Sequence, residues 1–226
     1  MIYVVGDMHG YFENFRNTVD REFENCNTIL SVGDFGYWPH TEYFRKNIAH
    51  LAVMKAPIYF CDGNHEDHHS LQKKVKKCQT TKIIPNVYYQ PRGSVLDIGG
   101  YKILFFGGAS SIDKHLRTPG FDWFPEENIT EKDLQNLPPE NTKIDIVISH
   151  TCPTEFNIKD DLYNGHDFNR IALSHILHTF KPNLWFFGHW HKAKVGAYDN
   201  TVYIALNQFK RNGYFYQLQE KWNSNS

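Results

Sequence analysis

Short apolar runs alternate with polar, amphipathic stretches along the first third of the chain. The runs at residues 1–5, 28–32 and 57–61 are rich in β-branched and aromatic residues and stop at glycine or aspartate, which is typical of buried strands. Residues 11–24 and 40–54 instead carry apolar side chains at helical spacing. This alternation predicts successive strand–loop–helix units and therefore an α/β domain.

The rest of the chain predicts more strands, separated by two long polar loops at residues 107–127 and 155–169. Aromatic residues in the first loop argue against disorder, so we expect it to form a wall over the functional site. Residues 1–219 are expected to form a single domain and residues 220–226 a polar C-terminal tail. The expected strands are residues 87–90, 94–98, 101–106, 143–148, 183–187, 194–197, 202–206 and 213–218, and the expected helices are residues 130–137 and a segment starting near 167–169 and ending at 180.

Polar side chains that commonly bind metal ions follow five of the predicted strands. A random scatter of aspartate and histidine would not track strand ends in this way, and ligands of α/β folds bind at the carboxyl ends of strands. The residues at these five ends are Asp7 and His9, Asp34, Asn64 and His65, His150, and His189 with His191. The other histidines are expected to be structural: His68 and His69 at an exposed helix start or loop, and His175 and His178 on the surface of a helix.

The chemistry of these side chains narrows the kind of metal site. Oxygen and imidazole ligands without thiolate suit Mn, Fe, Zn, Ni or Co better than a closed structural zinc site. Even seven ligands out of these eight side chains exceed what one ion needs, so the sequence predicts two divalent ions, and paired ions commonly share a bridging carboxylate. The high count of 13 histidines agrees with a metal-binding protein.

Composition is that of an ordinary soluble globular protein and argues against some partners. The formal net charge of the 226-residue chain is −1, which gives no global electrostatic case for nucleic acid or membrane as a partner. Its four cysteines form no C-x-x-C pair, and no apolar run approaches the length of a membrane span. With no signal peptide visible either, we expect free thiols in a reducing compartment and a cytoplasmic protein.

Five short blocks of this sequence together resemble the calcineurin-like metallophosphoesterases. The blocks are GDMHG at 6–10, GDFG at 33–36, GNHE at 63–66, SH at 149–150 and GHWH at 188–191. They occur in the family's order. The resemblance implies an α/β (α+β) fold, a four-layer αββα sandwich of two mixed β-sheets flanked by helices, with a binuclear metal centre.

The same resemblance implies a role for each candidate residue. Asp34 would bridge the two ions, which we expect to be Mn²⁺ before Fe, Zn, Ni or Co. A metal-bridging hydroxide would attack the phosphoester, while His65 would lie beside the metals and assist the leaving group, with Glu66 orienting its ring. The ligands implied for the first ion are Asp7, His9 and His191, and those for the second are Asn64, His150 and His189.

One departure from the family's pattern bears on the substrate. The Ser/Thr protein phosphatases continue the second block with an arginine that contacts phosphate, whereas here it reads GDFGYWP, without arginine. That branch is therefore not expected. Lys114 or Arg117 of the long loop are candidates for the missing anion contact. Tyr37 and Trp38 are candidates for stacking on a substrate ring, although packing is the alternative for both.

Three hypotheses follow. The first is a phosphoesterase for a small or nucleotide-like phosphoester, either a monoester or a diester. The second is a nuclease acting on nucleic-acid phosphodiesters, which the near-neutral charge disfavours. The third is a non-catalytic scaffold on the same fold, which the complete ligand set disfavours. The physiological substrate and the oligomeric state are left open by the sequence.

Overall fold

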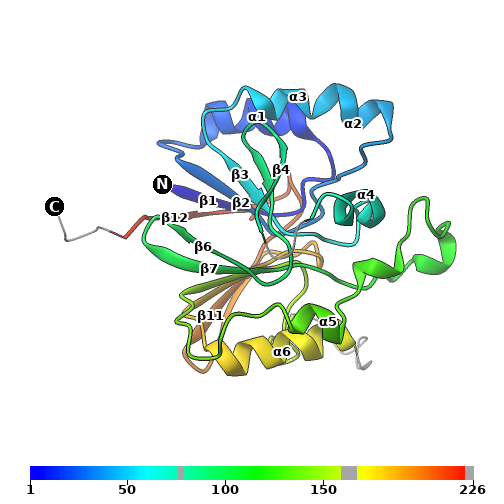
Figure 1. The fold of residues 1–226 in the computed structure, drawn as a ribbon. Coiled ribbons are helices and arrows are strands. Elements are labelled where there is room, and N and C mark those ends of the chain that lie inside the picture. The colour runs from blue at the N-terminus through cyan, green and yellow to red at the C-terminus, as the bar shows by residue number, and fades with distance from the viewer. Residues whose placement is uncertain (76–78, 159–166, 222–226) are drawn as a thin grey trace.

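Two six-stranded β-sheets face each other in the computed structural model, which describes residues 1–75, 79–158 and 167–221. Helices α1, α2 and α3 cover the outer face of one sheet, and α5 and α6 cover the outer face of the other (Figure 1). The layers therefore run helix, sheet, sheet, helix. This arrangement confirms the predicted αββα sandwich.

The first sheet has the order β12-β1-β2-β3-β5-β4. Strands β1, β2, β3 and β5 run parallel, and the two edge strands β12 and β4 run antiparallel to their neighbours. Its three N-terminal strands therefore end at the same edge of the sheet. The strands are β1 (Ile2–Val5), β2 (Thr28–Ser31), β3 (Ile58–Phe60), β4 (Thr81–Ile84), β5 (Val87–Tyr89) and β12 (Phe215–Leu218).

The second sheet has the order β10-β11-β9-β8-β7-β6. Its central strands β7, β8, β9 and β11 are parallel, and β6 and β10 form antiparallel edges. Parallel strands covered on both faces are expected to be buried throughout, as β8 is. The strands are β6 (Ser94–Ile98), β7 (Tyr101–Phe106), β8 (Ile146–Ser149), β9 (Leu184–Phe187), β10 (Lys194–Tyr198) and β11 (Thr201–Ala205).

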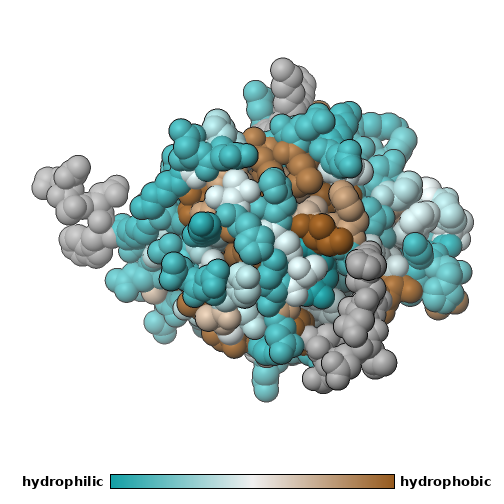
Figure 2. All heavy atoms as spheres, turned by 90° about the horizontal axis from the view of Figure 1, so that it is seen from below, coloured by the Kyte–Doolittle hydropathy of each residue, from teal (hydrophilic) through white to brown (hydrophobic). Residues whose placement is uncertain are grey.

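The helices pack an apolar face against a sheet and expose the opposite face. In α1, Phe12, Phe15 and Val19 are buried at helical spacing. Figure 2, seen from the α6 side, shows hydrophobic groups scattered among a mostly hydrophilic surface. None of the described helices is long and apolar enough to cross a membrane. The helices are α1 (Phe12–Glu22), α2 (Glu42–Asn47), α3 (Ala49–Ala52), α4 (His68–Gln72), α5 (Glu131–Leu134) and α6 (Phe168–Phe180).

Several local predictions differ from the structure. The helix expected at 40–54 is two short helices, α2 and α3, which meet at Ile48. Strand β4 was not predicted, since this edge strand is only partly buried and carries the exposed Lys82 within its apolar run. The loop at 107–127 contains two 3-10 turns, Lys114–Leu116 and Pro125–Glu127.

The start of the predicted C-terminal tail is held in place. The Glu220 carboxylate lies 2.9 Å from the N-terminal amine of Met1, and Lys221 Nζ lies 2.9 Å from Asp145 Oδ1. These ion pairs tie the end of the chain to both sheets. Residues 222–226 lie outside the described residues.

Candidate metal centre

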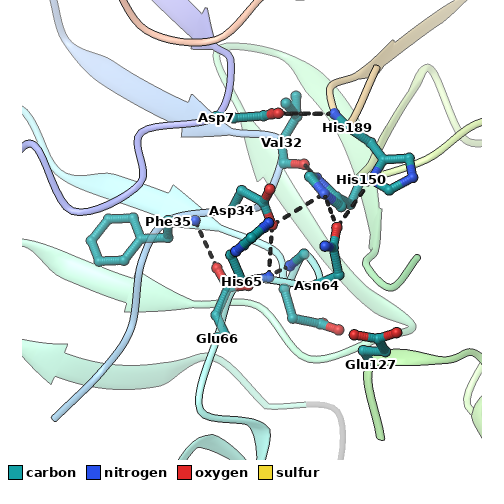
Figure 3. A network of polar contacts seen from close by, with 12 residues as sticks. Asp7, Val32, Asp34, Phe35, Asn64, His65, Glu66, Glu127, His150 and His189 are labelled. Atoms are coloured by element: carbon teal, nitrogen blue, oxygen red, sulfur yellow. Dashed lines mark hydrogen bonds and ion pairs between the residues drawn. The ribbon is translucent and has the colours of Figure 1, made fainter. Parts of the chain in front are cut away.

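The predicted ligand residues meet where the parallel strands of both sheets end. Asp7 and His9 follow β1, Asp34 follows β2, and Asn64 follows β3 in the first sheet. Residues 150, 189 and 191 follow β8 and β9 in the second sheet. Figure 3 shows side chains from both sheets pointing toward one another across this end of the sandwich. The fold thus brings together residues from opposite ends of the chain.

One group of donor atoms comes from Asp7, His9, Asp34 and His191. One ligand atom from each residue lies within 4.8 Å of the others. His191 Nε2 is 3.1 Å from Asp7 Oδ2 and 3.4 Å from His9 Nε2, and His9 Nε2 is 3.7 Å from Asp34 Oδ2. Both carboxylates are buried, whereas 42% of the His191 side chain is exposed. Two imidazoles and two carboxylates around one point suit a divalent transition-metal ion.

A second group of donor atoms lies deeper and shares Asp34 with the first. Asn64 Oδ1 is 3.1 Å from His150 Nε2 and 3.0 Å from His189 Nδ1. His150 Nε2 is also 3.2 Å from Asp34 Oδ1. The two Asp34 oxygens therefore face different groups. A carboxylate in this position can bind two ions at once.

The hydrogen bonds around the second group show that it needs a positive charge. His150 Nδ1 donates to the Val32 carbonyl oxygen over 2.9 Å, so its Nε2 faces Asp34 Oδ1 and Asn64 Oδ1, which are both acceptors. Burial lowers the pKa of His150, but Asp34 outweighs it and raises the pKa to about 10. A proton on Nε2 therefore takes the place of a bound cation, which would accept the lone pairs of His150 Nε2, Asp34 Oδ1 and Asn64 Oδ1. The donor set therefore fits a metal ion.

The two histidines of this group have pKa values shifted in opposite directions. Burial, reinforced by the nearby His150, lowers the pKa of His189 to about 3, so its ring is neutral and can act as a ligand. Burial raises the pKa of Asp34, but His150, His65 and His9 together hold it well below its ordinary value. Asp34 is therefore an anion that faces both donor groups.

The backbone at the site is strained in a way that aims the ligands. His9, Asp34, His189 and His191 have φ angles of 46°, 46°, 66° and 47°. Left-handed backbone at a non-glycine residue costs on the order of 1 kcal/mol or more and is concentrated at functional sites. Such turns let successive side chains after a strand point into one site.

Two glycines permit the close approach of the loops that carry the carboxylates. A Cβ at Gly188 would lie 1.9 Å from Asp7 Oδ1, and a Cβ at Gly63 would lie 2.2 Å from Asp34 Oδ1. Neither position has room for a side chain. This explains in physical terms why glycine stands in the blocks GNHE and GHWH.

Ser111 and Glu127 fix the orientation of the Asn64 amide. Ser111 donates its hydroxyl and its backbone N–H to the two Glu127 carboxylate oxygens, both over 2.6 Å. The Ser111 oxygen accepts from Asn64 Nδ2 over 3.1 Å, which leaves Asn64 Oδ1 facing His150 and His189. These outer residues were not predicted, since a lone serine and glutamate in a long loop carry no local signal.

Substituting Ser111 is therefore expected to weaken metal binding without unfolding the protein. Ser111→Ala removes the acceptor for Asn64 Nδ2, and we expect about a tenfold to hundredfold loss in Mn²⁺ affinity, the usual range for residues that orient ligands. Calorimetric titration of metal-stripped protein measures it. Ser70→Ala on α4 is the control, because Ser70 bonds Asp67 and not Asn64 or Glu127. Equal Mn²⁺ affinity of the Ser111→Ala and Ser70→Ala variants would refute this role.

The structure places His65 beside the centre and reassigns Glu66. The backbone N–H of His65 donates to Asp34 Oδ1, and its ring lies 5.0 Å from the His9 ring. Glu66 does not orient that ring. Its buried carboxylate instead accepts from the backbone N–H groups of Gly63 and Phe35, so it fixes the loops after β2 and β3.

The four candidate substrate contacts lie in different surroundings. Arg117 reaches the centre, with Nη2 3.0 Å from His65 Nε2. Lys114 is exposed, and no contact places it at the site. Tyr37 is only 1% exposed and packs edge-on against Phe44, so it belongs to the core and has no free face for a substrate. Trp38 is half-buried and is considered below.

The prediction for His68 is wrong, although it does start helix α4. Its side chain is buried, and Nε2 donates to the Gly63 carbonyl oxygen over 2.9 Å. Burial lowers the pKa of His68 to about 4. His69, His175 and His178 are exposed, as predicted.

The fold and the site together define a class of protein. A two-sheet sandwich with aspartate, asparagine and histidine side chains converging at its strand ends is the architecture of a metallohydrolase. A family model described as calcineurin-like phosphoesterase matches residues 1–193, which is most of the chain. The chain belongs to the calcineurin-like phosphoesterase family, as the sequence blocks indicated. This membership supports a hydrolase that acts on phosphoester bonds.

Individual relatives agree with this assignment. Lariat debranching enzyme of Schizosaccharomyces pombe is 28% identical over 159 residues, covering 61% of this chain and 34% of the relative. Lariat debranching enzyme of Drosophila pseudoobscura pseudoobscura is 25% identical over 232 residues, covering 84% and 42%. The chain thus spans less than half the length of these two relatives. Among solved structures, the protein TT1561 of Thermus thermophilus shares the fold, with a TM-score of 0.58 at 13% identity over 92% of this chain and 88% of that chain.

Proposed function

We propose that the protein is a phosphoesterase that uses two divalent metal ions, with Mn²⁺ the leading candidate. The observation that carries this proposal is the position of Asp34, whose two oxygens face two separate groups of nitrogen and oxygen donors. The first ion would be held by Asp7, His9 and His191 and the second by Asn64, His150 and His189, with Asp34 between them. Two bound divalent ions would supply positive charge for the phosphate and lower the pKa of bound water.

The chain's own residues would position the substrate and handle the leaving group. His65 lies at the edge of the centre, and Arg117 only donates hydrogen bonds, so His65 Nε2 is the acceptor in this contact. When Arg117 exchanges this bond for one to the substrate, His65 Nε2 can take up a proton from solvent and donate it to the leaving oxygen. His65 is therefore proposed to assist the leaving group, with Asp34 holding its backbone N–H.

The experiment that tests this function compares two simple substrates. Metal-stripped protein is loaded with Mn²⁺ and given p-nitrophenyl phosphate or bis-p-nitrophenyl phosphate. We expect turnover of at least one of them, and the ratio of the two assigns a monoester or a diester preference. Mn²⁺-loaded protein that hydrolyses neither compound would contradict a general phosphoesterase.

A second candidate is cleavage of nucleic-acid phosphodiesters. It is favoured by the two relatives, both of them lariat debranching enzymes. The near-neutral charge of this chain argues for a small substrate rather than a long polyanion. Cleavage of an oligonucleotide that falls steeply with rising salt would support this candidate. The scaffold hypothesis is disfavoured, since all of the predicted ligand side chains are present and converge.

A further inference from the structure

The loop at residues 107–127 is fastened to the metal centre at its base. Ser111 accepts from Asn64 Nδ2, and Glu127 accepts from Ser111, as described above. The buried guanidinium of Arg92 donates to the backbone carbonyl oxygens of residues 126 and 127 and to Asp62, close to the end of β3. In Figure 1 the loop, drawn in green, projects beyond α4 from the rest of the molecule. A fixed base with a projecting tip is suited to presenting side chains to a bound substrate.

The loop delivers one arginine to the edge of the centre. The Arg117 side chain is 10% exposed, and its Nη2 lies 2.8 Å from Asp113 Oδ1 and 3.0 Å from His65 Nε2. Among the described residues, both side-chain contacts use Nη2. A guanidinium carries five N–H donors in a planar fork, so Nη1 and Nε remain to donate to a phosphate oxygen. Arg117 is thus positioned to bind an anion beside His65.

A line of aromatic rings leads from the core to the tip of the same loop. Phe124 is buried, and its ring lies 6.2 Å from that of Trp38. Trp38 in turn lies 6.0 Å from His40, and His40 lies 6.1 Å from Phe121. The Phe121 side chain is 65% exposed although it is large and apolar. Exposed apolar groups that cluster next to a site commonly mark a binding surface.

This ring line is joined to the segment that carries His65. His40 Nδ1 is 3.2 Å from Asp67 Oδ2, and Asp67 follows His65 by two residues. Phe121 lies four residues after Arg117 in the same loop. An anion-binding arginine and exposed rings therefore occupy neighbouring positions, which matches a ligand with a phosphate next to a planar ring.

We propose that Arg117 and the rings of Trp38, His40 and Phe121 form a subsite for nucleotide-like phosphoesters. Arg117 binds the phosphate, and the rings stack on the planar group beside it. This inference rests on the proposed function and names the substrate class of the same centre. Base stacking on aromatic side chains tolerates any base, because each base presents a π-face. The subsite would therefore select for a ring rather than for a particular base.

Direct binding tests the subsite without requiring turnover. Mn²⁺-loaded protein is titrated calorimetrically with AMP and with ribose 5-phosphate, which share the phosphate and the sugar but differ in the ring. We expect AMP to bind about tenfold more tightly, in the range of one stacked base. Phe121→Ala and Trp38→Ala should each remove most of this preference. Arg117→Ala should weaken both ligands about tenfold and leave the preference intact.

Matched variants make the result specific. Leu116→Ala removes another exposed apolar side chain of the same loop, 78% exposed, and should leave the AMP preference unchanged. Arg16→Ala on α1 removes an exposed arginine far along the chain and should affect neither ligand. Equal binding of AMP and ribose 5-phosphate by the unaltered protein would overturn the ring subsite, even if phosphoesters are hydrolysed. A clear AMP preference without any hydrolysis would contradict the proposed function instead.

Discussion

Asp34→Asn is expected to reduce phosphoester turnover by about a thousandfold, since it removes a buried negative charge that faces both donor groups. Asparagine keeps the shape of the side chain, and its oxygen can still accept the His65 backbone N–H that now bonds Asp34 Oδ1 over 2.9 Å. The loss should therefore reflect charge rather than unfolding. Initial rates on bis-p-nitrophenyl phosphate or p-nitrophenyl phosphate with saturating Mn²⁺ measure it.

The control for this substitution is Asp20→Asn, which makes the same change at an aspartate on α1 whose side chain is 62% exposed. It should retain full turnover. Bound Mn²⁺ per chain, measured in the same samples, should fall in Asp34→Asn and stay constant in Asp20→Asn. Unchanged turnover in a folded Asp34→Asn variant would show that Asp34 does not hold metal ions for the reaction.

Arg92→Ala is expected to cause the largest loss of stability, about 3–5 kcal/mol. The Arg92 guanidinium is buried and lies 2.7 Å from Asp62 Oδ2 and 3.0 Å from Asp133 Oδ2. It also donates to the carbonyl oxygens of residues 126, 127 and 128. Removing it leaves a buried carboxylate and several buried acceptors without a donor. The free energy of unfolding in urea measures the effect.

The pH dependence of this loss has a definite sign. Burial raises the pKa of Asp62, but Arg92 outweighs it and lowers that pKa below its ordinary value. A lowered pKa contributes stability above the ordinary pKa of aspartate, and this is lost as the pH falls through the lowered value. The difference between the unaltered protein and Arg92→Ala should therefore narrow in acid.

Two further variants keep this prediction testable. Arg92→Lys preserves the charge but not the fork of donors, so its stability should lie between those of the unaltered protein and Arg92→Ala. It remains measurable if Arg92→Ala does not fold. Arg16→Ala should change stability by less than about 0.5 kcal/mol, as is usual for surface sites. An Arg92→Ala variant as stable as Arg16→Ala would contradict the role of Arg92 in holding the loop.

The strand ends and the ligands on them could be predicted because their signals are local. Each strand is a short apolar run, and the ligand follows it within a few residues beside a glycine. Asp7, for example, comes directly after the run that forms β1 and Gly6. Parallel strands then bring such positions to one edge of a sheet. The resemblance to the family indicated that two sheets pack together and share one site, which periodicity alone does not predict.

The supporting contacts could not be predicted, since they join residues that are distant in the sequence. Ser111 contacts Asn64 across 47 positions, and Arg92 contacts Asp62 across 30. The burial of His68 also depends on a distant residue, since its ring lies 6.4 Å from that of Phe124, although its hydrogen-bond partner, the Gly63 carbonyl, is local. Tyr37 was a candidate for stacking on a substrate ring with packing as the alternative, and the structure has it packed in the core.

The strand ends and the loop at 107–127 have different roles in function. Rigid strand ends fix the donor atoms, while the loop at 107–127 supplies Arg117 and Phe121, which we propose to contact the substrate. Loops on a rigid scaffold change substrate without changing the chemistry of the scaffold. Substitutions of Arg117 and Phe121 should therefore alter which phosphoester binds, and substitutions at strand ends should remove activity altogether.

The measurement that tests the central claim most directly is a titration of metal-stripped protein with Mn²⁺. Bound Mn²⁺ per chain and the rate of phosphoester hydrolysis are followed in the same samples. The account predicts no hydrolysis by the stripped protein, saturation at two bound ions per chain, and full hydrolysis only as the second ion binds. Full hydrolysis by the stripped protein, or saturation at a single ion, would contradict a centre in which Asp34 joins two metal sites.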